Sequence, residues 1–158
     1  MSFPEGFDEQ IALLLPLHLR GPREALLRDA NRRRPALKEA WPSLRQANWL
    51  GEEAARATSV QDILKHLEQQ GPRWADKQAS PRLHEIIADK IGDRLKQDVV
   101  VAIRNAAAQV AEILDLRDLP EYVPDEAWTA REQLALARLY IGALVTLRRI
   151  DMAREGEI

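Results

Sequence analysis

The chain has 158 residues and is 46% hydrophobic, which is the size and composition of one globular domain and excludes an intrinsically disordered chain. Its net charge of -2 excludes a protein that attracts nucleic acid through its overall charge. Cysteine is absent, which excludes disulfides, thiolate metal ligands and a cysteine nucleophile.

The N-terminal part of the chain predicts two helices separated by a break. In residues 8–19 apolar side chains recur at helical spacing, and Asp8 is the predicted N-cap. Gly21 and Pro22 predict the break, because proline suits the first position of a new helix. Pro35 ends this second helix or bends it into the next segment.

The middle of the chain predicts a broken helical region followed by one short helix. Residues 35–57 are helical in pattern but interrupted by proline and glycine. Thr58 and Gln61 fit the S/T-x-x-E/Q capping box, which predicts a helix that ends near Gln70. Residues 71–79 then form a polar connector.

The second half of the chain predicts two long helices. Ser80 as N-cap and Pro81 at the first helical position begin the first, whose apolar spacing continues to about residue 116. The β-branched segment 98–103 also fits a buried strand, but the helical spacing on both sides favours a helix. The last helix covers residues 125–154, and its acidic first turn suits the helix dipole.

Together these elements predict an all-α fold. We expect a helical bundle with two long antiparallel C-terminal helices, at about 81–116 and 125–154, and shorter N-terminal helices packed on them. The whole chain, residues 1–158, is predicted to form one helical domain. The alternative is a subdivision into a basic short-helix region, 1–70, and a long helical hairpin, 80–158.

The location expected from the sequence is the cytoplasm. The first ten residues are acidic and lack the positively charged start of a signal peptide. The most apolar run, residues 134–147, is shorter than the about 20 residues that a membrane-spanning helix needs. A reducing compartment also suits a chain without cysteine. We therefore expect no membrane contact.

The sequence contains no motif for catalysis or for a cofactor. It has no phosphate-cradling glycine loop, no dinucleotide-binding glycine pattern and no G-x-S-x-G motif. His18, His66 and His84 lack the spacing of a metal-binding helix. We therefore predict a non-enzymatic protein without catalytic residues, metal or cofactor. A small-molecule pocket between helices is the remaining alternative.

The main functional signal is a basic segment near the N-terminus. Between Leu17 and Gln46 there are eight basic and three acidic residues, a net charge of +5 against -7 in the rest of the chain. Cations gathered on one face can hold a phosphate backbone without reading its sequence. The predicted nucleic-acid-binding residues are Arg20, Arg23, Arg28, Arg32, Arg33, Arg34, Lys38 and Arg45.

A purely structural role for these cations stays open. The three consecutive arginines at 32–34 fall in the last turn of the second predicted helix, where the helix dipole favours cations. Glu24 and Arg28 have the spacing of an ion pair on one helix face. Trp41 and Trp49 are suited either to stacking on unpaired bases or to anchoring the core.

The last helix carries a second candidate surface. Between residues 134 and 147 it is apolar nearly all the way round, which is typical of a helix covered on several sides by its own core or by another chain. The predicted protein-interface residues are Leu134, Ile141, Leu144, Val145 and Leu147.

These two features predict a non-enzymatic helical subunit of a larger assembly. Its arginine patch would contact the phosphate backbone of RNA or single-stranded DNA, and its last helix would contact other protein subunits. The alternative function is a protein-only adaptor, chaperone or regulator that uses the same apolar helix as its interface. The sequence predicts no oligomeric state, and a helical fold by itself implies no function.

Overall fold

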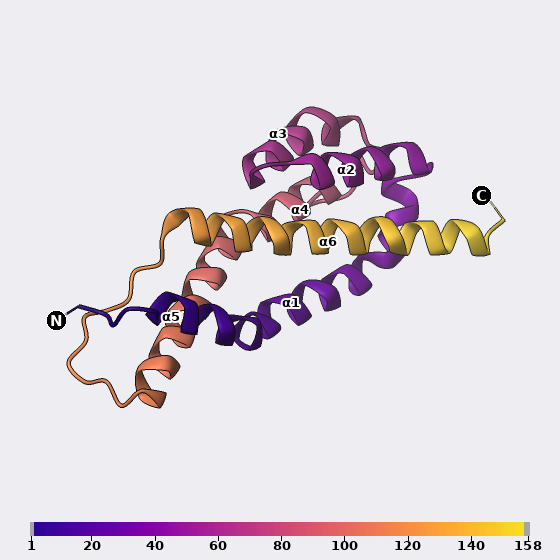
Figure 1. Cartoon of the computed structure of the whole chain (residues 1–158). Coiled ribbons are helices and arrows are strands. Elements are labelled where there is room, and N and C mark those ends of the chain that lie inside the picture. Colours follow the sequence, from indigo (N-terminus) through magenta and orange to yellow (C-terminus); the bar gives the residue numbers. More distant parts are fainter. Residues whose placement is uncertain (1, 157–158) are drawn as a thin grey trace.

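The chain folds into helices and connecting loops over residues 2–156, which are the residues that the computed structural model describes (Figure 1). In chain order the elements are α1 (Phe7–Ala40), α2 (Leu44–Arg56), α3 (Val60–Gln70), the short 3-10 turn η1 (Gly71–Arg73), α4 (Leu83–Ile91), α5 (Asp93–Ile113) and α6 (Glu126–Arg154). The prediction of an all-α bundle is confirmed, and segment 98–103 is helical within α5. No helix in this part of the chain combines the length and the apolar character needed to cross a membrane.

The other helices are arranged around α6. It lies between the α2–α3 pair on one side and α1 and α5 on the other (Figure 1). Its buried side chains extend from Thr129 to Met152 and occupy several faces, as the apolar run predicts. One buried hydrophobic cluster contains side chains from every α-helix, so the segments 1–70 and 80–158 share it.

The longest helix, α1, is continuous over 34 residues, where the sequence predicted two helices. The predicted break at Gly21 and Pro22 is therefore wrong, and of the two outcomes predicted for Pro35, an end or a bend, the end does not occur. A proline inside a helix removes one backbone hydrogen bond. Helix α1 nevertheless packs on both α5 and α6, and burial of its apolar side chains outweighs the missing bonds. Figure 1 shows that the path of α1 bends without ending, which is the usual effect of proline in a packed helix.

Two predicted helix starts are displaced. The N-cap of α1 is Gly6, whose φ of 81° places it in the left-handed region, and Asp8 lies inside the first turn. The capping box predicted to begin at Thr58 begins one residue later, at Ser59, whose hydroxyl accepts the backbone N–H of Asp62. In return the Asp62 carboxylate accepts the backbone N–H of Thr58 at 3.1 Å. The side chains of Ser59 and Asp62 thus each accept a backbone N–H at the helix start, as in a capping box.

The predicted long helix at 81–116 is two helices. The backbone leaves helical geometry at Gly92, where φ is -83° and ψ is -136°, and α4 and α5 lie on either side of it. The predicted cap, Ser80, is not used, because α4 begins at Leu83. The Leu83 backbone N–H instead donates to the Asp76 carboxylate at 2.7 Å, so this helix start is stabilised from the connector.

The last helix is confirmed within one residue. Asp125 is its N-cap and accepts the backbone N–H groups of Ala127 at 2.7 Å and Trp128 at 3.4 Å. Helix α5 is steeply inclined to α6 in Figure 1, and it packs mainly against α1. The expectation of short N-terminal helices holds for α2 and α3 and fails for α1, which is the longest helix and converges with α6 toward the C-terminal ends of both.

Long polar side chains of α6 satisfy the carbonyl ends of three other helices. Gln133 donates to the carbonyl oxygens of Ile91 and Gly92, at the end of α4, at 2.9 and 3.0 Å. Arg138 donates to those of Ala54 and Ala57, at the end of α2. Arg148 donates to that of Trp41, at the end of α1, at 2.9 Å. Each guanidinium also faces the negative end of a helix dipole.

A buried carboxylate on α1 joins three helices. Asp29 is 6% exposed and accepts the Tyr140 hydroxyl of α6 at 2.5 Å, while the Lys90 ammonium of α4 lies 3.6 Å away. Burial by itself raises the pKa of Asp29, but hydrogen bonds from Tyr140 and Arg32 and the charges of Arg33 and Lys90 outweigh it. The net result is a pKa below the usual value, so the carboxylate stays charged and its partners stay attached.

Replacing Tyr140 tests how much its buried hydrogen bond to Asp29 stabilises the fold. Tyr140→Phe keeps the buried ring and removes one hydrogen bond to a charged group, so the free energy of unfolding should fall by about 1.5–3 kcal/mol. Urea unfolding followed by circular dichroism measures the change. The matched control is Tyr122→Phe, which loses an exposed hydrogen bond to Asp8 and should cost no more than about 1 kcal/mol. Equal losses in the two variants would contradict the assignment.

Candidate nucleic-acid interface

Five of the eight residues in the predicted basic patch form ion pairs with carboxylates of the same chain. The pairs are Arg20 with Glu24, Arg32 and Arg33 with Asp29, Arg34 with Asp151, and Lys38 with Glu155. Glu24 thus pairs with Arg20 and not with Arg28, although the Arg28 charge also helps to lower the pKa of Glu24. A large part of the predicted patch is therefore neutralised within the fold.

The helix dipole does not account for the three consecutive arginines. Residues 32–34 lie more than one turn before the end of α1 at Ala40, and the dipole effect is confined to the last turn. Their positions follow from tertiary partners instead. Arg32 and Arg33 contact the buried Asp29, and Arg34 reaches α6.

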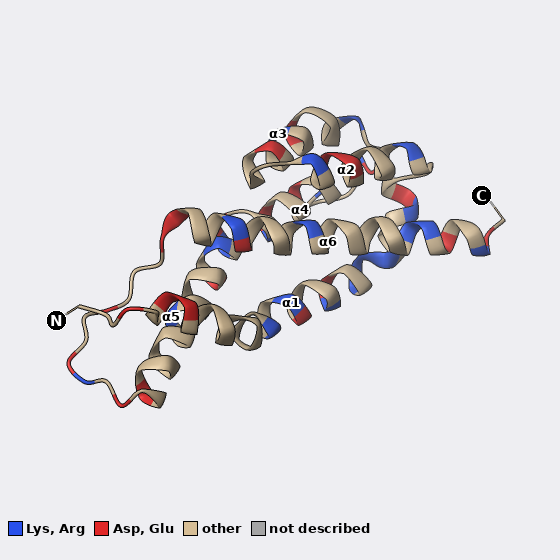
Figure 2. Ribbon diagram, viewed as in Figure 1, with Lys and Arg blue, Asp and Glu red and all other residues tan. Residues whose placement is uncertain are grey.

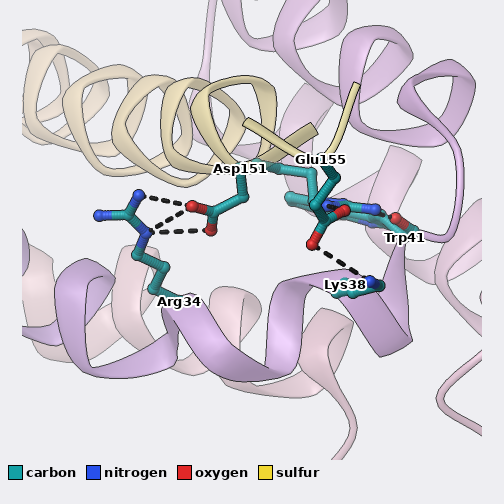
Figure 3. A network of polar contacts seen from close by, with 6 residues as sticks. Arg34, Lys38, Trp41, Asp151 and Glu155 are labelled. Atoms are coloured by element: carbon teal, nitrogen blue, oxygen red, sulfur yellow. Dashed lines mark hydrogen bonds and ion pairs between the residues drawn. The ribbon is translucent and has the colours of Figure 1, made fainter. Parts of the chain in front are cut away.

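Figure 3 shows how Arg34 and Lys38 hold the C-terminal ends of α1 and α6 together. The Arg34 guanidinium donates to both oxygens of Asp151, at distances of 2.5 to 3.0 Å. These hydrogen bonds hold the pKa of Asp151 below its usual value. Lys38 Nζ donates to Glu155 at 3.1 Å, and Arg148 Nη1 lies 3.6 Å from the second Glu155 oxygen. These two patch residues therefore align helices.

The other three patch residues remain available to a partner. Arg23, Arg28 and Arg45 are exposed, and none of them forms a hydrogen bond or an ion pair with any residue in 2–156. Arg23 and Arg28 lie on the outer face of α1, and Arg45 lies in the first turn of α2. An anion that approaches these side chains has no hydrogen-bonded carboxylate to displace, although Glu24 lies close enough to Arg28 for their charges to interact.

The basic and acidic segments of the sequence lie at opposite ends of the folded molecule. Residues 28–45 and 148–155 meet where α1 and α6 converge, and they hold nine basic and four acidic residues, a net charge of +5. Residues 2–9 and 112–126 lie at the opposite end and hold nine acidic and one basic residue, a net charge of -8 (Figure 2). We call the first of these regions the basic end. A field of this form attracts a polyanion to one end only.

The two tryptophans considered for base stacking have different roles. Trp41 is fully buried and packs edge to face with Trp74, with ring centroids 5.2 Å apart, so it anchors the core. Trp49 is 42% exposed and packs edge to face with His66, also at 5.2 Å. Of these two tryptophans, Trp49 is the one that presents its indole to solvent and to a ligand.

Trp49 lies in a pocket between α2, α3 and η1, which we call the α2–α3 hollow. Its volume is about 210 Å³. Its lining consists of Arg45, Gln46, Trp49, His66, Gln70, Arg73 and Trp74. The lining includes two arginines and no carboxylate, which is the composition of a site for an anion. Arg73, like Arg45, has no ion-pair partner within residues 2–156.

Two polar groups inside the hollow lack protein partners. His66 is 8% exposed, and its ring has no hydrogen bond to any described residue. Burial is the main cause that lowers the pKa of His66, so its imidazole is neutral at neutral pH and can both donate and accept. The side-chain oxygen of Gln46 is buried without a hydrogen-bond partner. Buried polar atoms normally have one, so both groups suit a polar ligand.

The sequence identified only part of this hollow. Arg45 was a predicted contact and Trp49 was left open between base stacking and the core, whereas Gln46, His66 and Arg73 were not considered. The sequence places His66 and Arg73 more than fifteen residues after Trp49 and gives no spacing that links them. The α2–α3 packing and the η1 turn bring them together.

The predicted protein-interface residues of α6 belong to the core of the chain. Leu134, Ile141, Leu144 and Val145 are buried, and Leu147 is partly buried against the same cluster. Helices α1 and α2 provide much of this cover. A protein partner would therefore have to bind a different surface of the folded chain.

The histidines do not gather into a metal site. Within residues 2–156 no group of three or more His, Cys, Asp or Glu residues could hold a metal ion. His18 hydrogen-bonds Gln109 at 2.6 Å, and His84 packs beside Trp74.

Comparison of the chain with protein-family models, curated proteins and solved structures finds no match.

The close packing of the η1 turn against α4 depends on a glycine. A Cβ atom on Gly71 would lie 2.2 Å from the His84 ring, so Gly71→Ala should lower the free energy of unfolding by about 1–3 kcal/mol through overpacking. The control is Gly142→Ala in α6, where a Cβ atom meets nothing within 4 Å. This substitution should raise the free energy of unfolding by about 0.5–1 kcal/mol, because alanine favours the helix over glycine. Urea unfolding measures both variants. A stabilising Gly71→Ala would contradict this packing.

Proposed function

We propose that this protein is a non-enzymatic helical subunit of a larger assembly and that its basic end, together with the α2–α3 hollow that shares Arg45 with it, binds the phosphate backbone of a single-stranded nucleic acid. The observation that carries the proposal is the α2–α3 hollow. It has two arginines without internal partners, no carboxylate and an exposed indole. Phosphate contacts from arginine combined with stacking on an aromatic ring are the usual means of holding single strands.

The charge distribution supports the same partner. Arg28 and Arg45 belong to the basic end and have no ion pair within residues 2–156, so phosphates can approach them directly. The opposite end, residues 2–9 and 112–126, which we call the acidic end, would repel nucleic acid and is available for contacts with protein subunits. The net charge of -2 hides both regions.

A salt series tests the binding of phosphates. Binding of labelled single-stranded oligonucleotides, followed by fluorescence anisotropy, should weaken as salt rises because phosphate contacts release counterions. The double variant Arg28→Glu/Arg45→Glu should bind at least about tenfold more weakly. It should also flatten the log–log salt dependence by about 0.7 for each phosphate of the single strand that the variant no longer binds.

The control variant changes a charge at the acidic end. Arg117→Glu reverses one exposed arginine far from the basic end and should leave oligonucleotide affinity nearly unchanged. Absent or salt-insensitive binding by the wild type would refute the proposal. An equal loss of affinity in Arg117→Glu and in a single Arg45→Glu variant would show that only overall charge matters.

A further inference from the structure

The α2–α3 hollow combines features that phosphate binding alone does not require. Arginines are sufficient to hold a backbone, yet this hollow also contains an exposed indole, a buried neutral histidine and a buried amide oxygen without a partner. These three groups lie in the same lining as the two arginines. Their chemistry matches a flat ring with polar edges.

We propose that the α2–α3 hollow binds one unpaired nucleobase, which stacks on Trp49 while its edge meets His66 and Gln46. This inference rests on the proposed function, because it names how the bound single strand is held. Arg45 and Arg73 contact the phosphates that flank the base. A base paired in a duplex cannot enter, so the hollow selects single strands.

Trp49 is placed to stack. Large aromatic side chains usually bury most of their surface, and Trp41 and Trp74 in this chain do so, whereas Trp49 keeps 42% of its surface exposed. The edge-to-face contact with His66, at an interplanar angle of 75°, fixes the orientation of the indole. A ring held in advance loses little rotamer freedom when a base stacks on it.

The polar groups of the hollow complement a base edge. A neutral imidazole offers one donor and one acceptor, and the Gln46 amide adds an acceptor that is buried and unused. Every nucleobase presents donors and acceptors along its edge. Pairing them removes the cost of leaving buried polar atoms unsatisfied.

The dimensions of the hollow fit a single ring system. Its volume of about 210 Å³ is below the roughly 300–1,000 Å³ of pockets that hold drug-sized molecules. A neighbouring pocket of about 320 Å³ shares Trp49, His66 and Gln70, and its lining holds two carboxylates, Glu53 and Asp62, beside two cations, Arg56 and Lys65. The charges of that lining balance, whereas Arg45 and Arg73 face no carboxylate in the α2–α3 hollow, so phosphates favour the side of Trp49 where these two arginines lie.

The test compares an ordinary single-stranded oligonucleotide with an abasic one of the same length. Both have the same phosphates, and only the first can fill the hollow. The wild-type protein should bind the base-bearing strand at least about tenfold more tightly, as expected for one stacked base. Trp49→Leu should remove this preference and leave the affinity for the abasic strand and its salt dependence unchanged.

The rescue variant Trp49→Phe keeps an aromatic face and should retain much of the preference. Circular dichroism and the unfolding midpoint establish that each variant is folded. Equal wild-type affinity for the two strands, or an unchanged preference in folded Trp49→Leu, would overturn the base pocket while the backbone proposal stands. Failure of the wild type to bind either strand would overturn both.

Discussion

The fold depends on the requirement that carbonyl groups at buried helix ends find donors, and α6 supplies these donors. The last turn of a helix leaves its carbonyls without intrahelical partners. Three of these ends, in α1, α2 and α4, point at α6, where Arg148, Arg138 and Gln133 donate to them. Because the three side chains are on one rigid helix, their spacing along α6 fixes where the other helices end relative to one another.

The same demand for partners explains how the many arginines are used. Arg34 and Lys38 align α1 with α6, and Arg82 donates to the carbonyl oxygens of Gly71, Pro72 and Trp74, which fixes the η1 turn. Such contacts give many of the cations a structural role inside the fold. Arg45 and Arg73 matter among the cations without an ion pair because they share one hollow.

The hollow follows from the architecture around it. The η1 turn brings Arg73 and Trp74 back toward α2, and Gly71 lets the chain pass close to the His84 ring. Helix α3 then places His66 against Trp49. A rigid frame that holds an indole and two polar groups in advance lowers the entropy lost when a ligand binds. The arrangement therefore suits recognition better than a mobile basic tail would.

The sequence by itself determined the helical class, the last helix with its Asp125 cap and the segregation of charge, because spacing, capping and composition are local properties. It misjudged Pro22 and left open whether Pro35 ends or bends the helix, since proline removes a backbone hydrogen bond locally while packing of α1 on α5 and α6 offsets that loss. Only the tertiary structure decided which arginines are paired and which line a hollow with Trp49 and His66. Residues that are distant in sequence come into contact only when the helices pack, and local sequence patterns do not predict such contacts.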